Sequence, residues 1–374
     1  MTSYIDVSAA VHRRAGLGRY AESLARSLVS QAPGRFALFH NRERGYAALQ
    51  GFGRTPSRSV PLGYKPWRMI VWLAQLSGIG FDRLLPDADL YHATEHLLMP
   101  LHRVPSVLTV HDLIFHLFPQ HHKKLNYWYL SKTMPLFCDR AAAIITVSRA
   151  SKRDIVRCYG VPEDKVTVVH EAAASHFCPP SSAEVEAIRQ RYGLPVRYVV
   201  HVGTIEPRKN LVRLVNAIQQ VRDSLPEIGL VIVGKKGWLY GEFYELVAGL
   251  PAEAVISLGY VSDEDLPAVY GGAALCAIPS LYEGFGLPVL EAMACGTPVV
   301  CSHTSSLPEV GGDAPAYFDP EDTDAMAEVM RRVLDDRQLQ REMSEKGLAQ
   351  AASFSWERAA QETMKVYDRV QSVT

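Results

Sequence analysis

Two glutamates eight residues apart mark the segment best suited to chemistry. Glu283 lies in a glycine-containing loop, and Glu291 falls inside the helix expected in EGFGLPVLEAMACG, residues 283–296. Pro288 suits the first helical position and Gly296 suits the C-terminal stop. The backbone N–H groups at such a helix start favour a phosphate, and they belong to Phe285, Gly286 and Leu287. A carboxylate beside a phosphate would accept hydrogen bonds from sugar hydroxyls; the alternative is a well-capped helix with one exposed and one core-lining glutamate.

Two adjacent cations form a second motif. Arg208 and Lys209 lie in HVGTIEPRKNL, residues 201–211, at the end of one predicted strand and just before a helix. Fixed cations in this position can stabilise the negative charge that develops on a leaving diphosphate, without a metal ion. The alternative interpretation is a solvated surface turn.

Short apolar runs alternate with helical stretches along the whole chain, which predicts the α/β class with parallel strands and crossover helices. The strands expected in the first half are residues 4–7, 36–40, 89–94, 106–112, 142–148 and 166–172. Those expected in the second half are residues 197–203, 229–234, 254–259, 274–279, 298–302 and 316–319. The second set makes a complete doubly wound sheet, whose ligand is expected at the carboxyl ends of the strands.

An interruption at CPPSS, residues 178–182, predicts a linker between two domains. We therefore expect one domain over 1–178, a second over 179–354, and a last helix in 355–374 that is able to cross back to the first domain. A length of 374 residues agrees with two domains, and 48% hydrophobic residues without low-complexity tracts indicate a globular protein.

The small net charge of −1 hides two opposed halves. Residues 1–180 hold 22 Lys and Arg against 13 Asp and Glu, a net charge of +9, which leaves −10 for the remainder. Such asymmetry suggests that the first half meets something anionic, although two solvated surfaces would give the same numbers. Residues 1–16 lack the charged start and apolar block of a signal peptide, and no segment approaches the length of a spanning helix, which disfavours secretion and membrane spanning. The six cysteines form no C-x-x-C pair, so we expect a cytoplasmic protein with reduced thiols.

Taken together, the E-x7-E segment, the EPRKN loop, an early glycine loop and the HD pair at 111–112 resemble a retaining nucleotide-sugar glycosyltransferase of family 4. The resemblance covers nearly the whole chain. It implies the GT-B fold, in which two Rossmann-like domains face each other across a cleft, with the first on the acceptor side and the second binding the nucleotide sugar.

The resemblance also implies roles for residues of the second domain. Glu283 would contact hydroxyls of the donor sugar and Glu291 the ribose, while Lys209 and a nearby arginine would hold the diphosphate. This family often has arginine directly after the glycine that ends the first strand of this domain, but this sequence has Thr204 there. Arg208 is therefore expected to supply the guanidinium.

Other implied residues come from both domains. Gly16 and Gly18, in the early glycine loop, would close over the phosphates, and His111 would lie near the transferred sugar. The nucleotide base would stack near Val261, with Asp263 close to its edge.

What is transferred follows from the same resemblance. The EPRKN loop resembles that of bacterial mannosyltransferases of polysaccharide assembly, so GDP-mannose is the first expected donor and a UDP-sugar the alternative. The acceptor would be a glycan or a lipid-linked glycan. Retention in this family is thought to use front-face attack, with the leaving phosphate taking the acceptor proton, and the sequence offers no carboxylate obviously placed as a nucleophile. A phosphorylase, an epimerase and a non-catalytic protein that binds nucleotide sugars are the alternatives from other classes.

No cofactor or metal ion is expected. HATEH, residues 92–96, matches an inverted zinc-protease signature, but the surrounding pattern is that of a strand, so His92 or His96 is expected to line the cleft instead. A D-x-D triplet at Asp87 and Asp89 precedes the same strand, at the end opposite to the expected ligand.

One further segment, residues 64–81, is apolar and aromatic and is flanked by Lys65 and Arg68. It is too short to span a bilayer, but with Trp67 and Trp72 it would suit a peripheral enzyme resting on an anionic membrane. Burial against the first sheet explains the pattern equally well. The basic half lacks the aromatic stacking motifs of RNA-binding sheets, so no nucleic-acid partner is expected.

Overall fold

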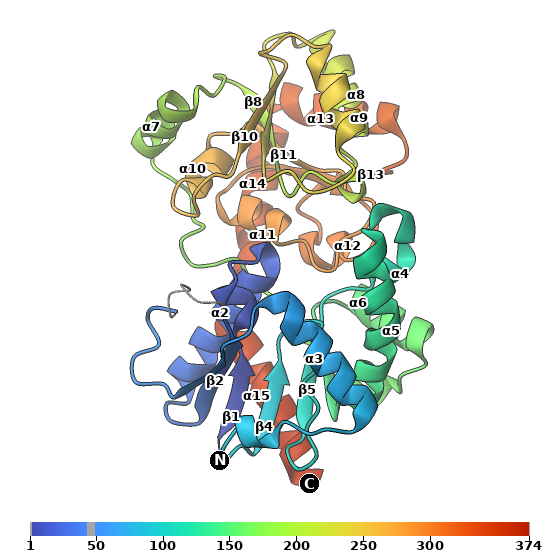
Figure 1. Ribbon diagram of the computed structural model, residues 1–374. Helices are drawn as coiled ribbons and strands as arrows, with labels where there is room; N and C mark the ends of the chain where they lie inside the picture. The colour runs from blue at the N-terminus through green and yellow to red at the C-terminus, as the bar shows by residue number, and fades with distance from the viewer. Residues whose placement is uncertain (1, 43–48, 374) are drawn as a thin grey trace. The chain divides into compact units, whose positions relative to one another are not determined.

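The computed structural model describes residues 2–42 and 49–373. The chain divides into two compact units: unit 1 comprises Met1–Glu171 with Ser355–Thr374, and unit 2 comprises Ala172–Phe354. Each unit contains one parallel sheet covered by helices (Figure 1). The predicted fold class, two doubly wound Rossmann-like α/β units, is confirmed.

In the described part of unit 1 the sheet has seven strands in the order β3-β2-β1-β4-β5-β6-β7. The strands are β1 (Ser3–Asp6), β2 (Phe36–Asn41), β3 (Ser57–Val60), β4 (Leu90–Ala93), β5 (Ser106–Val110), β6 (Ala143–Thr146) and β7 (Val166–Val168). The helices are α1 (Ser8–Val11), α2 (Ala15–Gln31), α3 (Tyr64–Ser77), α4 (Ile114–Leu117), α5 (Lys124–Arg140), α6 (Arg149–Tyr159) and α15 (Trp356–Val373). The strand order reverses between β1 and β4, which makes the carboxyl ends of this pair the usual place for a ligand.

Two local features of unit 1 differ from the sequence prediction. Strand β3 was not predicted, because its sequence SRSV is mostly exposed and has no apolar run. Gly16 and Gly18 were expected in a loop but lie in the first turns of α2. Glycine at position 18 allows α2 to pack closely on α1, since a Cβ there would approach the carbonyl oxygen of Ala9 in α1 to 3.0 Å.

The sheet of unit 2 has six strands in the order β10-β9-β8-β11-β12-β13, and each corresponds to a predicted one. The strands are β8 (Tyr198–Val202), β9 (Gly229–Val233), β10 (Val255–Gly259), β11 (Leu275–Ile278), β12 (Val299–Ser302) and β13 (Ala316–Phe318). The helices are α7 (Ser182–Tyr192), α8 (Leu211–Arg222), α9 (Gly241–Ala248), α10 (Leu266–Gly271), α11 (Leu287–Ala294), α12 (Leu307–Gly311), α13 (Thr323–Asp335) and α14 (Arg337–Ala352). Buried β-branched and leucine side chains from β8, β9 and β11 pack against α8 and α13 to form the core.

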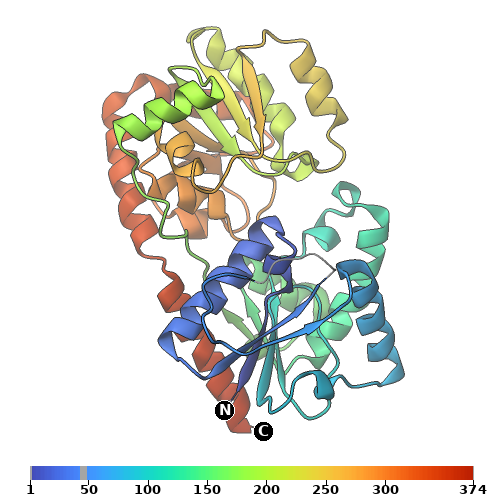
Figure 2. The same ribbon diagram turned by 60° about the vertical axis from the view of Figure 1, so that its left-hand side comes forward.

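The last helix, α15, belongs to unit 1 although it follows the whole of unit 2 in sequence (Figure 2). It packs along α2. The Trp356 ring lies edge-on to Tyr20, and the Tyr367 hydroxyl bonds to His92 of β4 at 2.5 Å. The end of the chain therefore completes the core of the first unit.

Among the described residues, none of the helices combines the length and the apolar character needed to cross a bilayer. All six cysteines are free thiols; four are buried, Cys158 is partly buried and Cys178 is exposed.

Candidate functional site

The predicted motifs of unit 2 meet where its strand order reverses. β8 pairs with β9 on one side and with β11 on the other, so the carboxyl ends of β8 and β11 are adjacent. The loop with Arg208 and Lys209 follows β8, and the loop with Glu283 follows β11. This is the position at which open parallel sheets bind ligands.

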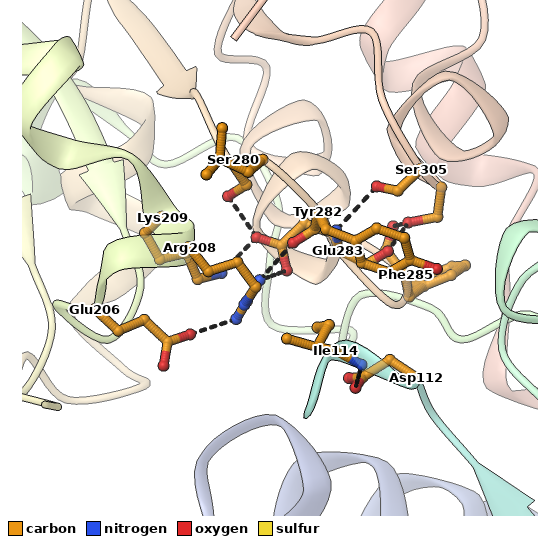
Figure 3. A network of polar contacts seen from close by, with 12 residues as sticks. Asp112, Ile114, Glu206, Arg208, Lys209, Ser280, Tyr282, Glu283, Phe285 and Ser305 are labelled. Atoms are coloured by element: carbon orange, nitrogen blue, oxygen red, sulfur yellow. Dashed lines mark hydrogen bonds and ion pairs between the residues drawn. The ribbon is translucent and has the colours of Figure 1, made fainter. Parts of the chain in front are cut away.

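Glu283 is the centre of a buried polar cluster (Figure 3). Its carboxylate accepts from Lys209 Nζ at 2.6 Å and from the Ser280 hydroxyl at 2.5 Å, and Arg208 Nη1 lies 2.8 Å away. Burial alone would raise the pKa of the Glu283 carboxyl, but the charges of Arg208 and Lys209, together with these hydrogen bonds, lower it to about 2. The cluster therefore holds an ionised carboxylate between two cations.

The loop after β8 is shaped to aim both cations at Glu283. Residues Pro207–Lys209 form a turn of 3-10 helix that ends at Asn210 in the left-handed conformation, with φ of 58°. The Asn210 amide secures this conformation by donating to the carbonyls of Pro279 and Pro320 at 3.1 and 2.7 Å. A Cβ on Gly203 would lie 3.3 Å from Lys209 Cε, so glycine leaves room for the lysine side chain.

Arg208 is fixed by further partners. It pairs with Glu206 at 2.5 Å and donates to the carbonyl of Tyr282 at 2.7 Å. Its own carbonyl accepts from the N–H of Leu281 at 2.9 Å. The guanidinium is thus shared between two carboxylates and tied to the loop that carries Glu283.

The Glu283 loop leads into α11 as the sequence predicted. The N–H of Glu283 donates to the Ser305 hydroxyl at 2.9 Å, and Ser306 donates to the carbonyls of Glu283 and Phe285 at 3.0 and 2.5 Å. Gly286, with φ of 118°, is the N-cap of α11, a conformation that strongly favours glycine. Phe285, Gly286 and Leu287 therefore lie at the helix start, where phosphate binding was expected.

The other predicted donor residues lie around this cluster with partners of their own. Glu291 is buried on α11 and accepts from the Tyr270 hydroxyl of α10 at 3.0 Å. Val261 is buried and Asp263 exposed in the loop after β10, and Thr204 is half-buried directly after β8. Their roles toward a donor stay predictions.

In unit 1, His111 follows β5 and is buried. Its Nδ1 lies 3.2 Å from Glu171 and its Nε2 lies 2.9 Å from the carbonyl of Thr94. Burial alone would lower the pKa of His111, but the hydrogen bond and charge of Glu171 outweigh it and raise the pKa above its usual value. With both ring nitrogens facing acceptors, His111 is suited to be a fixed positive charge rather than a proton acceptor.

The other histidines of unit 1 correct one expectation. His92 was predicted as a cleft-lining alternative to His96, but it is fully buried between Tyr367 and Thr109, and burial lowers its pKa to about 3. It is a neutral core residue. His96 is also buried, and its Nε2 accepts the backbone N–H of His111 at 3.2 Å. Within the described residues no group of three or more His, Cys, Asp or Glu side chains is placed to hold a metal ion.

Several polar residues of these sites were not predicted. In unit 1, Arg14 at the start of α2 pairs with buried Glu95 just after β4. In unit 2, Ser280 and Ser305 hydrogen-bond to Glu283, and His201, which is buried on β8, lies beside Lys209. The spacing of Ser280 three residues before Glu283 was the one local signal available; the other contacts join distant parts of the chain.

Comparisons with known proteins agree with this geometry. Residues 14–173 match the family model described as Glycosyltransferase Family 4, and residues 184–350 match Glycosyl transferases group 1. The chain is 35% identical to O-antigen chain mannosyltransferase B of Escherichia coli over 94% of this chain and 95% of that protein. It is also 30% identical to the serotype-specific mannosyltransferase WbdA of Escherichia coli, over 73% of this chain and 34% of that longer protein.

Solved structures share the fold at lower identity. Sucrose-phosphate synthase from Thermosynechococcus elongatus matches with a TM-score of 0.77 at 20% identity, over 100% of both chains. The Anabaena protein HepE in complex with UDP-glucose matches with a TM-score of 0.74 at 18% identity, over 99% of this chain and 100% of that one.

Proposed function

We propose that this chain, which belongs to glycosyltransferase family 4, transfers mannose from GDP-mannose to a glycan or lipid-linked glycan and retains the anomeric configuration. The observation that carries the proposal is the Glu283–Lys209–Arg208 cluster at the carboxyl ends of β8 and β11. It joins two cations suited to a diphosphate with a carboxylate suited to sugar hydroxyls.

The cluster gives each residue a chemical task. Arg208 and Lys209 bind the diphosphate and stabilise the charge that grows on it as the glycosidic bond breaks. Glu283, held ionised by the two cations, accepts hydrogen bonds from hydroxyls of the hexose. The backbone N–H groups at the start of α11 add a partial positive charge beside the phosphates.

Retention is proposed on the same chemistry. The buried carboxylate of the cluster is engaged by Lys209, Arg208 and Ser280, which suits hydroxyl binding better than attack on the anomeric carbon. In the proposed step the acceptor oxygen forms its bond to the anomeric carbon on the face that the phosphate leaves. The departing phosphate oxygen takes the acceptor proton, so atoms and charge balance without an enzyme nucleophile.

Mannose is proposed as the transferred sugar because of the names of the relatives. The nucleotide of the donor is a separate choice. Escherichia coli O-antigen chain mannosyltransferase B and WbdA are mannosyltransferases by name, whereas HepE was solved with UDP-glucose. A UDP-sugar is therefore the alternative donor, and GDP-mannose is preferred because the identity to the mannosyltransferases is higher.

The test compares nucleotides first and turnover second. A ligand that binds only the folded protein at ~100 times its Kd stabilises it by about 2.7 kcal/mol, which a thermal shift detects. GDP should stabilise the protein more than UDP, ADP or CDP, and GDP-mannose should be consumed only with a glycan acceptor. Preferential stabilisation by UDP would overturn the GDP assignment, and stabilisation without turnover by any donor would favour a protein that only binds nucleotide sugars.

The anomeric outcome needs its own measurement. Proton NMR of the first product formed should show the same anomeric configuration as the donor sugar. An inverted product would overturn the front-face mechanism.

For the location, we propose a cytoplasmic enzyme that works at the inner face of the cell membrane. A nucleotide-sugar donor is made in the cytoplasm, and a lipid-linked acceptor lies in the bilayer. Fractionation of cells should then divide the protein between the soluble and membrane fractions, with salt releasing the membrane-bound part.

A further inference from the structure

The outer face of two helices in unit 1 presents large apolar side chains to solvent. On α3 and just after it these are Met69, Ile70, Leu73, Leu76 and Ile79, and on α5 they are Leu125, Tyr127 and Trp128. Leu73 and Leu76 are 56% and 63% exposed, and Leu125 is 79% exposed. We call these eight residues the α3–α5 face.

The sequence left open whether residues 64–81 pack on the sheet or meet a membrane, and α3 provides surfaces for both. Trp67, Val71 and Ala74 are buried, and the first two belong to the core of unit 1. Met69, Ile70, Leu73 and Leu76 recur at helical spacing on the other side. Packing on the sheet therefore accounts for only one side of the helix.

Side-chain contacts join the two helices. The Trp72 and Trp128 rings meet edge to face, with centroids 5.2 Å apart. Arg68 donates to Asn126 at 3.1 Å and places its guanidinium 3.9 Å from the centre of the Tyr129 ring. Figure 1 shows α3 and α5 in unit 1. Aromatic side chains of both helices, Trp72 on α3 and Trp128 on α5, thus lie in contact between the exposed apolar residues of the two helices.

The two segments that carry this face contain basic but no acidic residues. Residues 64–79 and 113–138 contain no Asp or Glu. Lys65 at the start of α3 and Lys123, Lys124 and Lys132 on or beside α5 are exposed. An apolar face with Trp and Tyr, on segments that carry exposed lysines and no acidic residues, has the composition of a surface that lies on an anionic bilayer.

We propose that the α3–α5 face docks unit 1 on a membrane of anionic phospholipids, with the apolar residues in the interface and the lysines against the headgroups. At 14 residues, α3 is too short to span, so it lies in the interface plane. The biological purpose rests on the proposed function, because docking would bring the enzyme to a lipid-linked acceptor. The docking itself requires neither donor nor acceptor.

The test is co-sedimentation of the full chain with vesicles. Vesicles of phosphatidylcholine with 30% phosphatidylglycerol, a composition chosen for the assay, should bind the protein, whereas pure phosphatidylcholine should bind it at least ~10-fold more weakly. Raising the salt concentration should release the protein. Fluorescence of half-exposed Trp128 should shift to shorter wavelength on binding.

Two variants separate the apolar and the electrostatic contributions. Leu73→Gln with Leu76→Gln should weaken vesicle binding at least ~10-fold, and Lys123→Glu with Lys124→Glu should remove the preference for anionic lipid. Val196→Gln, a substitution of an 82% exposed apolar residue in unit 2, is the matched control and should leave binding unchanged. Far-UV circular dichroism checks that each variant is folded.

Other outcomes would overturn the proposal. Absence of vesicle binding by the folded chain would overturn it, and so would equal loss of binding in the Val196 control. If the unaltered chain is a dimer that does not bind vesicles, and the Leu73/Leu76 variant is a monomer, the face is an interface between two copies of the chain. Transfer to a water-soluble acceptor should be unaffected in the Leu73/Leu76 variant, so failure of membrane docking and failure of the proposed reaction give different results.

Discussion

Replacement of Lys209 by alanine should damage both catalysis and stability, for two separable reasons. Lys209 is buried and donates to Glu283 at 2.6 Å. Loss of one preorganised donor to a developing anion typically costs about 3 kcal/mol, so kcat should fall by roughly 100-fold. Loss of one partner of a buried ion pair costs about 3–5 kcal/mol, and we expect about 3 kcal/mol because Arg208 still faces Glu283 at 2.8 Å.

A double-mutant cycle separates these two effects. In Lys209→Ala with Glu283→Ala no carboxylate is left without its partner, so most of the lost unfolding free energy should return, with a coupling of about 2 kcal/mol. Activity should not return, because the cation is still missing. Urea denaturation gives the stabilities and initial rates with saturating donor give kcat.

Lys346→Ala serves as the control, since Lys346 is exposed on α14. It should change neither quantity. If Lys209→Ala kept kcat within about threefold of the wild type, the assignment of Lys209 to the diphosphate would be refuted. If the two substitutions were additive in stability, the buried pair would contribute no coupling.

Three further outcomes follow from the same geometry, and one follows from His111. For the predicted contact of Glu291 with the ribose, Glu291→Gln should raise the donor KM about tenfold with little change in kcat, since such a contact is the same in the ground and transition states; a pure kcat defect would contradict that role. The Glu283 carboxyl has its pKa lowered from 4.5 to about 2, so its contribution of about 3 kcal/mol is complete above pH 4.5 and is lost as the pH falls toward 2. Glu283→Gln should therefore flatten the acid limb of the stability–pH curve, and an unchanged limb would count against the buried ion pair. Transfer should survive EDTA after metal stripping because, in the proposed mechanism, Arg208 and Lys209 neutralise the diphosphate; loss of activity that Mg²⁺ or Mn²⁺ restores would disprove this. Since the His111 pKa is raised, its stabilising contribution should be complete below its unfolded pKa and be lost as the pH rises through the folded value; Glu171→Gln should lower that pKa in an NMR titration, and no change would contradict the pairing.

The strands were largely predictable because buried parallel strands are apolar on both faces. Gly229–Val233 is buried and is a continuous apolar run, and Tyr198–Val202 is buried and is interrupted only by His201. Ser57–Val60 was missed for the opposite reason, since an edge strand with exposed side chains carries no hydrophobic pattern. The two glycines early in α2 favour a loop by helix propensity, whereas in the structure Gly18 allows α2 to pack closely on α1.

The site was predictable in its parts but not in its pairing. Local motifs identified Glu283, Arg208 and Lys209, and placed them in separate roles. Their direct contact depends on β8 lying next to β11, which joins residues 74 positions apart and follows from strand order rather than from either motif. The burial of neutral His92 could not be predicted for the same reason, because it depends on a contact with Tyr367, which lies 275 positions later in the sequence.

The pairing in the cluster bears on how the proposed donor would bind. Arg208 and Lys209 carry two positive charges, and Glu206 and Glu283 carry two negative ones, so the cluster is balanced before any donor arrives. A diphosphate that draws Lys209 away from Glu283 would leave that buried carboxylate short of a partner, at a cost that a hexose hydroxyl can offset by donating to it. A nucleotide diphosphate without its sugar can satisfy only the cations. In the proposed mechanism the ion pair therefore couples recognition of the diphosphate to recognition of the sugar, and makes the intact donor the ligand that satisfies both sides of the cluster.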